Sequence, residues 1–287
     1  MKKTLAAFML FLPLAAGVIV APRPAAAADI GIGASLWCAW WRPSWAEAGE
    51  GLFPKFKVGP NVIGGPMLTV RINDAWGISA SYAYGSFTGT SALMLPVLRL
   101  PVVIDIERKA GRHEVDLIAA CSLHKYAKIF FGAKYWGYES ESRASFLAIS
   151  MKSLDNFHFA GPGVGLSFTI PLYKNFYLVP NVSGMCQFGP WKPLSSPLLG
   201  ILNRISGNSP TVIMYSGVNS TLSFVYYIEK ANLTVALGGR FQYAWIKNIG
   251  TGKTSADGLH DLFAGITLAA VYTFTVSGSP DNRTAPK

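Results

Sequence analysis

Two short segments of the sequence place a histidine beside a carboxylate: His113-Glu114-Val115-Asp116 and His260-Asp261. An imidazole and a carboxylate that converge on one water molecule can carry out general acid–base catalysis. Both segments have the alternating pattern of β-strands, in which adjacent side chains point to opposite faces of the sheet. His260 and Asp261 are adjacent, so they do not converge on one water molecule. The sequence therefore predicts that the protein is not an enzyme.

The cysteines and glycines give no sign of a metal site, a disulfide framework or a cofactor. Cys38, Cys121 and Cys186 are odd in number, and no two of them have the spacing of metal ligands. Their places in the alternating segments put all three on the face that we expect to meet lipid. The run Gly161-Pro162-Gly163-Val164-Gly165 lacks the spacing of a phosphate-binding loop. Its alternate glycines are expected to make room for a bulky neighbour or to sharpen the curvature of a sheet.

A third group of polar residues falls on the polar side of segments whose other side is apolar. They are Arg71, Glu114, Asp116, Lys134, Asn219, Arg240 and Gln242. If the turn between two of these segments is centred on Lys125, Asp116 lies opposite Lys134, where opposite charges attract across strands. An unpaired charge inside a narrow barrel is costly, which favours a salt-bridged plug. The alternative left open is a narrow channel that owes its selectivity to the same charges.

The composition indicates a membrane protein without membrane-spanning helices. Of 287 residues, 51% are hydrophobic and 14% are charged, against about 25% charged residues in an ordinary soluble domain. After residue 21 no stretch approaches the roughly 20 apolar residues of a spanning helix. A closed β-barrel is the other structure that satisfies its backbone in lipid. The net charge of +10 comes from singly scattered cations, so we expect no binding of nucleic acid.

The first residues have the order of a secretory signal peptide. Lys2 and Lys3 precede an apolar run over residues 5–20, and four alanines end at Ala28. This order predicts cleavage between Ala28 and Asp29. The expected organisation is a signal peptide over residues 1–28, a barrel over residues 29–276 and a periplasmic tail over residues 277–287.

From Asp29 onward, apolar and polar residues alternate with a period of two, most clearly in residues 75–87, 233–245 and 262–276. This is the pattern of strands with one face to lipid and the other to a lumen. Ten antiparallel strands are predicted, over residues 30–41, 62–73, 75–87, 112–123, 127–139, 158–171, 176–188, 211–228, 231–246 and 261–276. Short turns alternate with five longer connections, near residues 42–61, 88–111, 140–157, 189–210 and 247–260. We therefore expect an all-β, up-and-down transmembrane barrel with short periplasmic turns and long extracellular loops; eight strands are the alternative.

Aromatic residues gather toward both ends of these strands, as in the two aromatic belts of a membrane protein. The belt at the long-loop end is expected to contain Trp40, Trp41, Tyr82, Tyr84, Phe87, Tyr135, Trp136, Tyr138, Phe188, Trp191, Tyr243 and Trp245.

The signal segment, the hairpin repeat and Val271-Tyr272-Thr273-Phe274 near the end of the last strand resemble the small bacterial outer-membrane barrels of the OmpA and OmpW type. The resemblance covers residues 29–276 and implies insertion into the outer membrane. The sequence departs from that group because residues 275–287 follow Phe274 and because ten strands exceed the usual eight.

Two of the long connections, residues 93–106 and 194–205, are apolar for exposed loops. Large exposed apolar patches are commonly binding sites. The candidate contact residues are Leu93, Leu95, Leu98, Leu100, Leu198, Leu199, Ile201 and Leu202. Such loops could frame an entrance for hydrophobic molecules, as the OmpW resemblance implies, touch lipid or a partner, or fold inward and cap the lumen.

Three functions follow as hypotheses. The first is a monomeric, porin-like narrow channel for small solutes, including hydrophobic ones. The second is a closed structural barrel that displays loops to host molecules or envelope proteins. The third is a protease like the ten-stranded omptins, which carry Asp/Asp and Asp/His pairs near the outer rim; it requires His260 and Asp116 to be catalytic.

Overall fold

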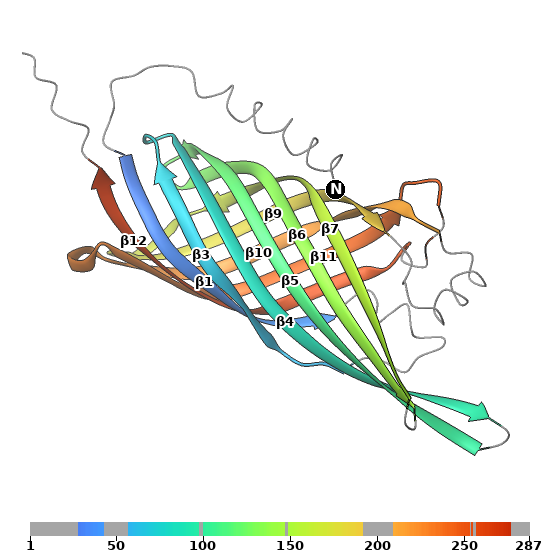
Figure 1. Cartoon of the computed structure of the whole chain (residues 1–287). Coiled ribbons are helices and arrows are strands. Elements are labelled where there is room, and N and C mark those ends of the chain that lie inside the picture. Colours follow the sequence, from blue (N-terminus) through green and yellow to red (C-terminus); the bar gives the residue numbers. More distant parts are fainter. Residues whose placement is uncertain are drawn as a thin grey trace, which may run out of the picture.

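The computed structural model describes residues 28–42, 57–97, 100–146, 149–191, 209–252, 254 and 257–276. Within these ranges the chain is almost entirely β-strand (Figure 1). The strands are β1 Ala28–Arg42, β2 Lys57–Val58, β3 Asn61–Arg71, β4 Trp76–Val97, β5 Leu100–His124, β6 Ala127–Phe146, β7 Ile149–Phe168, β8 Ile170–Tyr173, β9 Phe176–Trp191, β10 Thr211–Ile228, β11 Leu233–Asn248 and β12 His260–Val276, with a 3₁₀ turn η1 at Glu229–Ala231. Residues 1–27 of the expected signal peptide, the tail 277–287, and Leu98, Leu198, Leu199, Ile201 and Leu202 lie outside the described residues.

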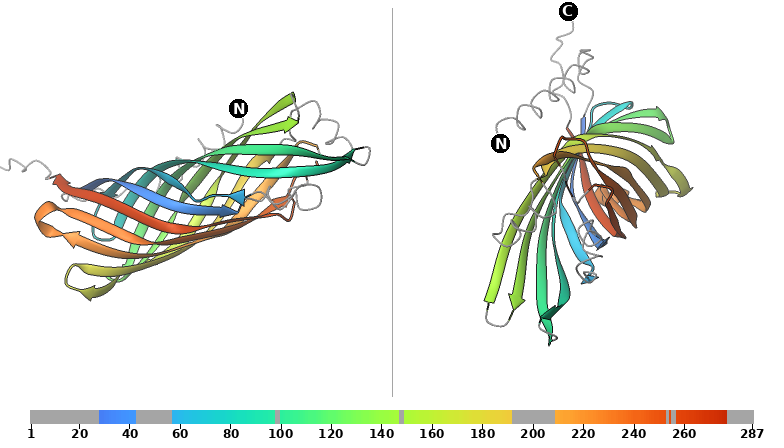
Figure 2. Two further views of the ribbon diagram at one scale, coloured as in Figure 1. Left: turned by 90° about the horizontal axis from the view of Figure 1, so that it is seen from below. Right: turned by 90° about the vertical axis from the view of Figure 1, so that its right-hand side faces the viewer.

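The strands close into an antiparallel, up-and-down barrel. Each long strand pairs with its neighbour along the chain, β12 pairs with β1 from Ala28↔Val276 to Arg42↔Leu262, and β9 pairs with β10. Of the twelve strands, β2 has only two residues and β8 continues β7 after Thr169, so ten strands form the wall. The prediction of ten strands is confirmed, and the alternative of eight is wrong. The strands are strongly tilted in the wall (Figure 2).

Short turns close one end of the barrel, at the positions expected from the sequence. At the first of them the Asn73 side-chain oxygen accepts hydrogen bonds from the backbone N–H groups of Ala75 and Trp76, 2.9 and 2.8 Å long. Asparagine makes this type of turn because its side chain can replace a backbone acceptor. Lys174 and Asn232 adopt positive φ in two of the other turns. We call this end the short-turn end and the opposite one the long-loop end.

The period of two determines which side chains face outward. Along β1, Ile32, Leu36 and Trp40 are 55%, 49% and 50% exposed on the outer face, while Trp37 and Trp41 between them are buried inside. Exposed apolar side chains lie on every strand around the wall, among them Leu68, Leu117, Val164, Val182, Leu222, Leu237 and Ile266. A continuous outward apolar band of this kind is typical of a surface that faces lipid. No helix among the described residues is long and apolar enough to cross a membrane.

Two of the expected long loops are instead extended hairpins. Residues 88–97 and 100–111 continue β4 and β5, whose pairing reaches Val97↔Leu100. Residues 140–146 and 149–157 continue β6 and β7, whose pairing reaches Phe146↔Ile149. Because β5 and β6 pair as far as Asp105↔Ser145, the two hairpins join into one four-stranded sheet. This projecting sheet, residues 88–97, 100–110, 139–146 and 149–157, extends beyond the rim of the barrel (Figures 1 and 2).

Candidate functional site

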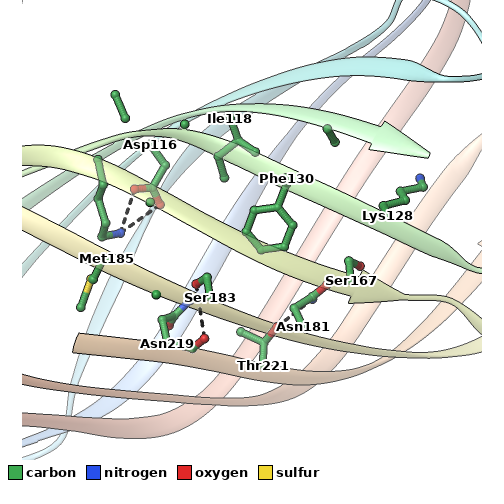
Figure 3. A pocket seen from close by; sticks show the side chains of 16 residues that line it. Asp116, Ile118, Lys128, Phe130, Ser167, Asn181, Ser183, Met185, Asn219 and Thr221 are labelled. Carbon is green, nitrogen blue, oxygen red and sulfur yellow. Dashed lines mark hydrogen bonds and ion pairs between the residues drawn. The ribbon is translucent and has the colours of Figure 1, made fainter. Parts of the chain in front are cut away.

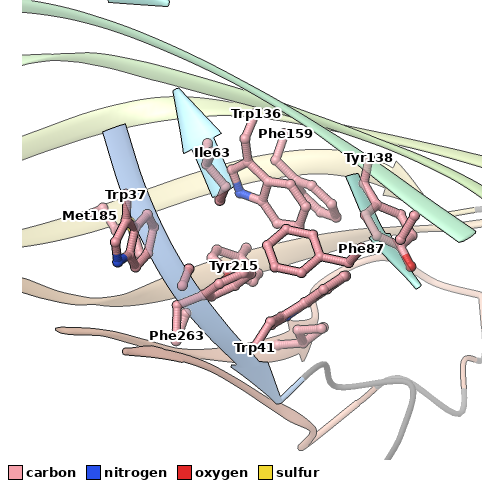
Figure 4. Close-up of a cluster of buried hydrophobic side chains, with 14 of the residues drawn as sticks. Trp37, Trp41, Ile63, Phe87, Trp136, Tyr138, Phe159, Met185, Tyr215 and Phe263 are labelled. Atoms are coloured by element: carbon pink, nitrogen blue, oxygen red, sulfur yellow. The ribbon is translucent and has the colours of Figure 1, made fainter. Parts of the chain in front are cut away.

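The lumen holds three layers between the long-loop end and the short-turn end: an aromatic plug, a network of charges and a cavity. The plug is a cluster of buried inward side chains (Figure 4). Trp41 stacks on Phe263 with ring centroids 5.1 Å apart and meets Phe87 edge-on at 5.0 Å. Trp136 stacks on Phe159 at 4.7 Å and meets Tyr215 edge-on at 4.8 Å. Each such aromatic pair stabilises by about 0.5–1.5 kcal/mol beyond the area that it buries.

Every strand of the wall contributes a buried side chain to the plug or its border. In chain order they are Trp37, Ile63, Phe87, Arg112, Trp136, Phe159, Gln187, Tyr215, Gln242 and Phe263. Gln187 links the plug to the wall, because its Oε1 accepts from Trp136 Nε1 at 2.9 Å and its Nε2 donates to the Lys134 carbonyl at 3.1 Å. Side chains therefore fill the lumen at this level.

The charge network lies beside the plug and is centred on Glu114, whose side chain is only 4% exposed. Its carboxylate pairs with Arg112 on one oxygen, and with Lys134 at 3.3 Å and Arg240 at 3.4 Å on the other. Lys134 also pairs with Asp116 at 2.8 Å. A buried carboxylate needs this many partners because desolvation of its charge is expensive.

The two arginines of the network are held against aromatic rings of the plug. The Arg112 guanidinium lies 3.9 Å from the centroid of Phe263, and that of Arg240 lies 4.2 Å from the centroid of Trp37. Arg240 also donates to Asn219 Oδ1 at 2.9 Å and to Gln242 Oε1 at 3.3 Å. Planar, always charged guanidinium groups suit such mixed aromatic and carboxylate surroundings. Plug and network thus form one packed unit.

Below the network, toward the short-turn end, the lumen is open. A cavity of about 350 Å³ is lined by both apolar and polar side chains, among them Ile118, Phe130, Met185, Asn181 and Ser183 (Figure 3). Asn181 donates to the Thr221 hydroxyl at 2.8 Å and Ser183 donates to the Asn219 carbonyl at 3.3 Å on its wall. Lys128 lines the cavity near the short turn that follows β5. The cavity has the size to hold water or a small solute.

The structure brings six of the seven predicted lumen residues together. Glu114, Asp116, Lys134, Asn219, Arg240 and Gln242 all belong to the network or contact it. The register pairs Asp116 with Lys134, as the alternation predicts. Arg71 lies apart, at the short-turn rim, where its side chain is 63% exposed and pairs with Asp29 at 3.4 Å.

Sequence reasoning missed Arg112, although its side chain is fully buried. The residue lies at the expected boundary between a loop and a strand. Its position in the alternation is the same as that of Glu114 and Asp116, and this was the signal that could have placed it on the lumen face. Part of the predicted long-loop aromatic belt is also wrong, because the prediction did not separate inward from outward positions. Trp41, Phe87, Trp136 and Tyr138 face the lumen and build the plug, whereas the other parity places Trp40, Tyr82, Tyr84, Phe188 and Trp245 outside.

The candidate catalytic pairs do not assemble. His260 is exposed on the outer face, while Asp261 is 3% exposed on the lumen side. No cluster of three or more potential metal ligands occurs among the described residues. Cys38, Cys121 and Cys186 are free thiols on outward positions of their strands.

Three of the eight expected apolar loop contacts lie among the described residues, and these three are in strands and not in loops. Leu93 and Leu95 belong to β4, where they pair with Ile104 and Val102 of β5, and Leu100 pairs with Val97. These positions are strand residues at the tip of the projecting sheet, because the hairpin pairing continues into the segment that the sequence predicts to be a loop.

No protein-family model matches the sequence, and no curated protein matches it. Solved structures that it resembles include the outer-membrane protease OmpT of Escherichia coli, with 12% identity and a TM-score of 0.49 over 89% of this chain and 99% of that chain. The attachment invasion locus protein Ail of Yersinia pestis has 12% identity and a TM-score of 0.32 over 86% and 98% of the two chains. The Pseudomonas putida toluene transporter TodX has 7% identity and a TM-score of 0.27 over 88% and 90%. At these identities and scores the likeness concerns the barrel architecture alone.

Proposed function

We propose that the protein is a monomeric, non-enzymatic barrel of the bacterial outer membrane whose lumen is closed and which acts by binding at its projecting sheet. The short turns then face the periplasm and the projecting sheet faces the cell exterior, the usual orientation of such barrels. The observation that carries the proposal is the filled lumen, to which all ten strands of the wall contribute a buried side chain. A pore needs a continuous water path, and this layer supports a closed barrel.

The projecting sheet supports a binding function at the long-loop end. Its backbone leaves the closed wall where pairing with the neighbouring strands ends, at Gly64↔Tyr84 on one side and at Ala160↔Phe188 on the other. From there β4 continues to Val97 beside β5, and on its other side the described residues that pair with it are the two of β2. The sequence at the tip of the β4–β5 hairpin is apolar from Ala92 to Ile104 apart from Arg99. An apolar projection outside a membrane favours a partner with an apolar surface, such as a protein or a membrane of a host cell.

The first test is single-channel recording from refolded protein in a planar bilayer. The closed lumen predicts no steady openings. Steady openings in correctly folded protein would overturn the proposal.

The second test shortens the projecting sheet without changing its register. Thr88 and Lys109 are directly paired, so an Asn-Gly turn can join them in place of residues 89–108. Bacteria that display this variant should lose attachment to immobilised host-cell membranes. The matched control joins the paired residues Ser142 and Ser153 in the same way, which shortens β6–β7 but keeps the apolar hairpin. Equal attachment of all three proteins would contradict a role for the β4–β5 hairpin.

A gated passage is the second candidate, because a cavity lies in the lumen between the charge network and the short-turn end. It predicts silent bilayers that begin to conduct when a small solute is added on the short-turn side. Silence under a panel of polar and aromatic solutes would remove this candidate.

A further inference from the structure

Three histidines on the outer face each share a hydrogen bond with a tyrosine of the neighbouring strand. The atoms are the tyrosine hydroxyl and histidine Nδ1 in every case. The distances are 2.8 Å for Tyr82–His113, 2.9 Å for Tyr135–His158 and 2.7 Å for Tyr243–His260. We call these the three Tyr–His pairs.

The pairs follow one geometric rule. In each, the histidine lies opposite the residue two positions after the tyrosine: His113 opposite Tyr84, His158 opposite Gly137 and His260 opposite Trp245. Each pair therefore reaches diagonally across the first and second strands of a hairpin whose connection lies at the long-loop end. Gly137 keeps space for one of them, since a Cβ there would lie 2.8 Å from the Tyr135 hydroxyl.

The pairs mark the border between apolar and polar positions of the outer face. Below His113, the outward residues of β5 are Val115, Leu117 and Ala119, and above it they are Gly111 and Lys109. On β11 the outward series runs from Leu237 through Phe241, Tyr243 and Trp245 to Lys247. In a membrane barrel this border is the layer of lipid headgroups, where amphipathic rings gather.

The hydrogen bond determines what each histidine offers to that layer. A phenol is the better donor toward a neutral imidazole, so Tyr O–H donates to Nδ1 and the ring proton stays on Nε2. Nε2–H is then a donor on the outer face. Lys109 and Lys247 place positive charge just beyond two of the pairs.

We propose that the three Tyr–His pairs bind phosphate groups of lipids in the leaflet at the long-loop end, through the Nε2–H of His113, His158 and His260. The tyrosines act as positioning residues that hold the imidazoles in the donating tautomer. The inference rests on the membrane-spanning orientation of the proposed function and is independent of the closed lumen.

The test compares two lipids of equal net charge and equal acyl chains in nanodiscs. Phosphatidylcholine carries a phosphate, and diglucosyl diacylglycerol carries none. Nitrogen-15 NMR of the full chain should show Nε2-protonated rings for the three histidines. Their Nε2–H signals should move downfield in phosphatidylcholine relative to the glycolipid. His124, exposed at the short-turn end, is the internal control and should not distinguish the lipids by as much.

A variant adds a readout that a merely structural role would not move. Changing Tyr82, Tyr135 and Tyr243 together to Phe keeps the rings but removes the bond that sets the tautomer. Loss of one such hydrogen bond changes affinity by about two- to tenfold, so the retention of phosphatidylcholine in native mass spectrometry should fall by at least that factor. The control Tyr226→Phe changes an outward tyrosine near a short turn and should retain lipid normally.

Two outcomes overturn the inference: Nδ1-protonated rings, or Nε2–H signals that are the same in both lipids. Failure of the barrel to embed in a membrane gives a different result. In that case brominated acyl chains would not quench the fluorescence of the protein, whereas quenching without a phosphate effect defeats the Tyr–His proposal alone.

Discussion

Lys134 bridges two carboxylates of the neighbouring strand, with its Nζ 2.8 Å from Asp116 and 3.3 Å from Glu114. The two acids differ in their surroundings, since the Asp116 side chain is 24% exposed and that of Glu114 is 4% exposed. Glu114 also neutralises Arg112 and Arg240. The stability of the plug therefore depends far more on Glu114 than on Asp116.

The first prediction follows from this asymmetry. Glu114→Gln leaves three cations around a neutral amide and should lower the free energy of unfolding by about 3–5 kcal/mol. Asp116→Asn should lower it by about 1 kcal/mol, because Lys134 keeps Glu114 and water reaches the site. Urea unfolding of the refolded protein, followed by tryptophan fluorescence, measures both. Equal losses for the two variants would contradict the central place of Glu114.

The second prediction concerns the seal of the lumen. Trp41 and Phe263 stack inside the barrel, so the double change Trp41→Ala and Phe263→Ala should remove much of the plug and produce channel openings in a planar bilayer. The control is Trp40→Ala, which changes the adjacent tryptophan on the outer face, 50% exposed. It should leave the bilayer silent. A silent double variant with a folded barrel would show that other side chains seal the lumen.

The alternation of the sequence was enough to predict the wall. It predicted ten strands, with eight as the alternative, and the pairing of Asp116 with Lys134, because the two faces of each strand differ in polarity and a shift of one residue would turn every side chain around. The same rule applied to Trp41 and Trp136 indicates the lumen. A tryptophan near a strand end is compatible with both the aromatic belt and the plug. Only its position in the alternation, outward or inward, distinguishes the two.

The projecting sheet could not be predicted in this way. Residues 93–104 are apolar at nearly every position, so they have no period of two from which a strand can be recognised. Arg112 is missed because it directly follows residues 88–111, which the sequence predicts to be a loop. The strands continue beyond the rim because neighbouring hairpins pair with each other. The local sequence pattern does not show this pairing.

The third prediction compares the accessibility of the cavity and of the plug to thiol reagents. In a background with Cys38, Cys121 and Cys186 changed to Ala, a cysteine at Ser183 lines the cavity and should react with a small water-soluble maleimide. A cysteine at Ala39, which is fully buried within the plug, should react at least about tenfold more slowly, as its reaction requires local opening. Comparable rates would mean that water passes the plug.

The last prediction uses two glycines of the wall that differ in their surroundings. A Cβ on Gly165 would overlap the Phe130 ring and the Val182 carbonyl, whereas a Cβ on Gly184 would meet nothing within 4 Å. The glycine run of β7 thus makes room for a bulky neighbour, as expected from its alternation. Gly165→Ala should lower the free energy of unfolding by about 1–3 kcal/mol, the usual cost of overpacking. Gly184→Ala should be neutral or stabilise by a few tenths of a kcal/mol, because it restricts the unfolded chain. The measurement is the urea midpoint of each variant. If Gly184→Ala lost as much stability as Gly165→Ala, then backbone freedom, and not the space beside Phe130, would be the reason for these glycines.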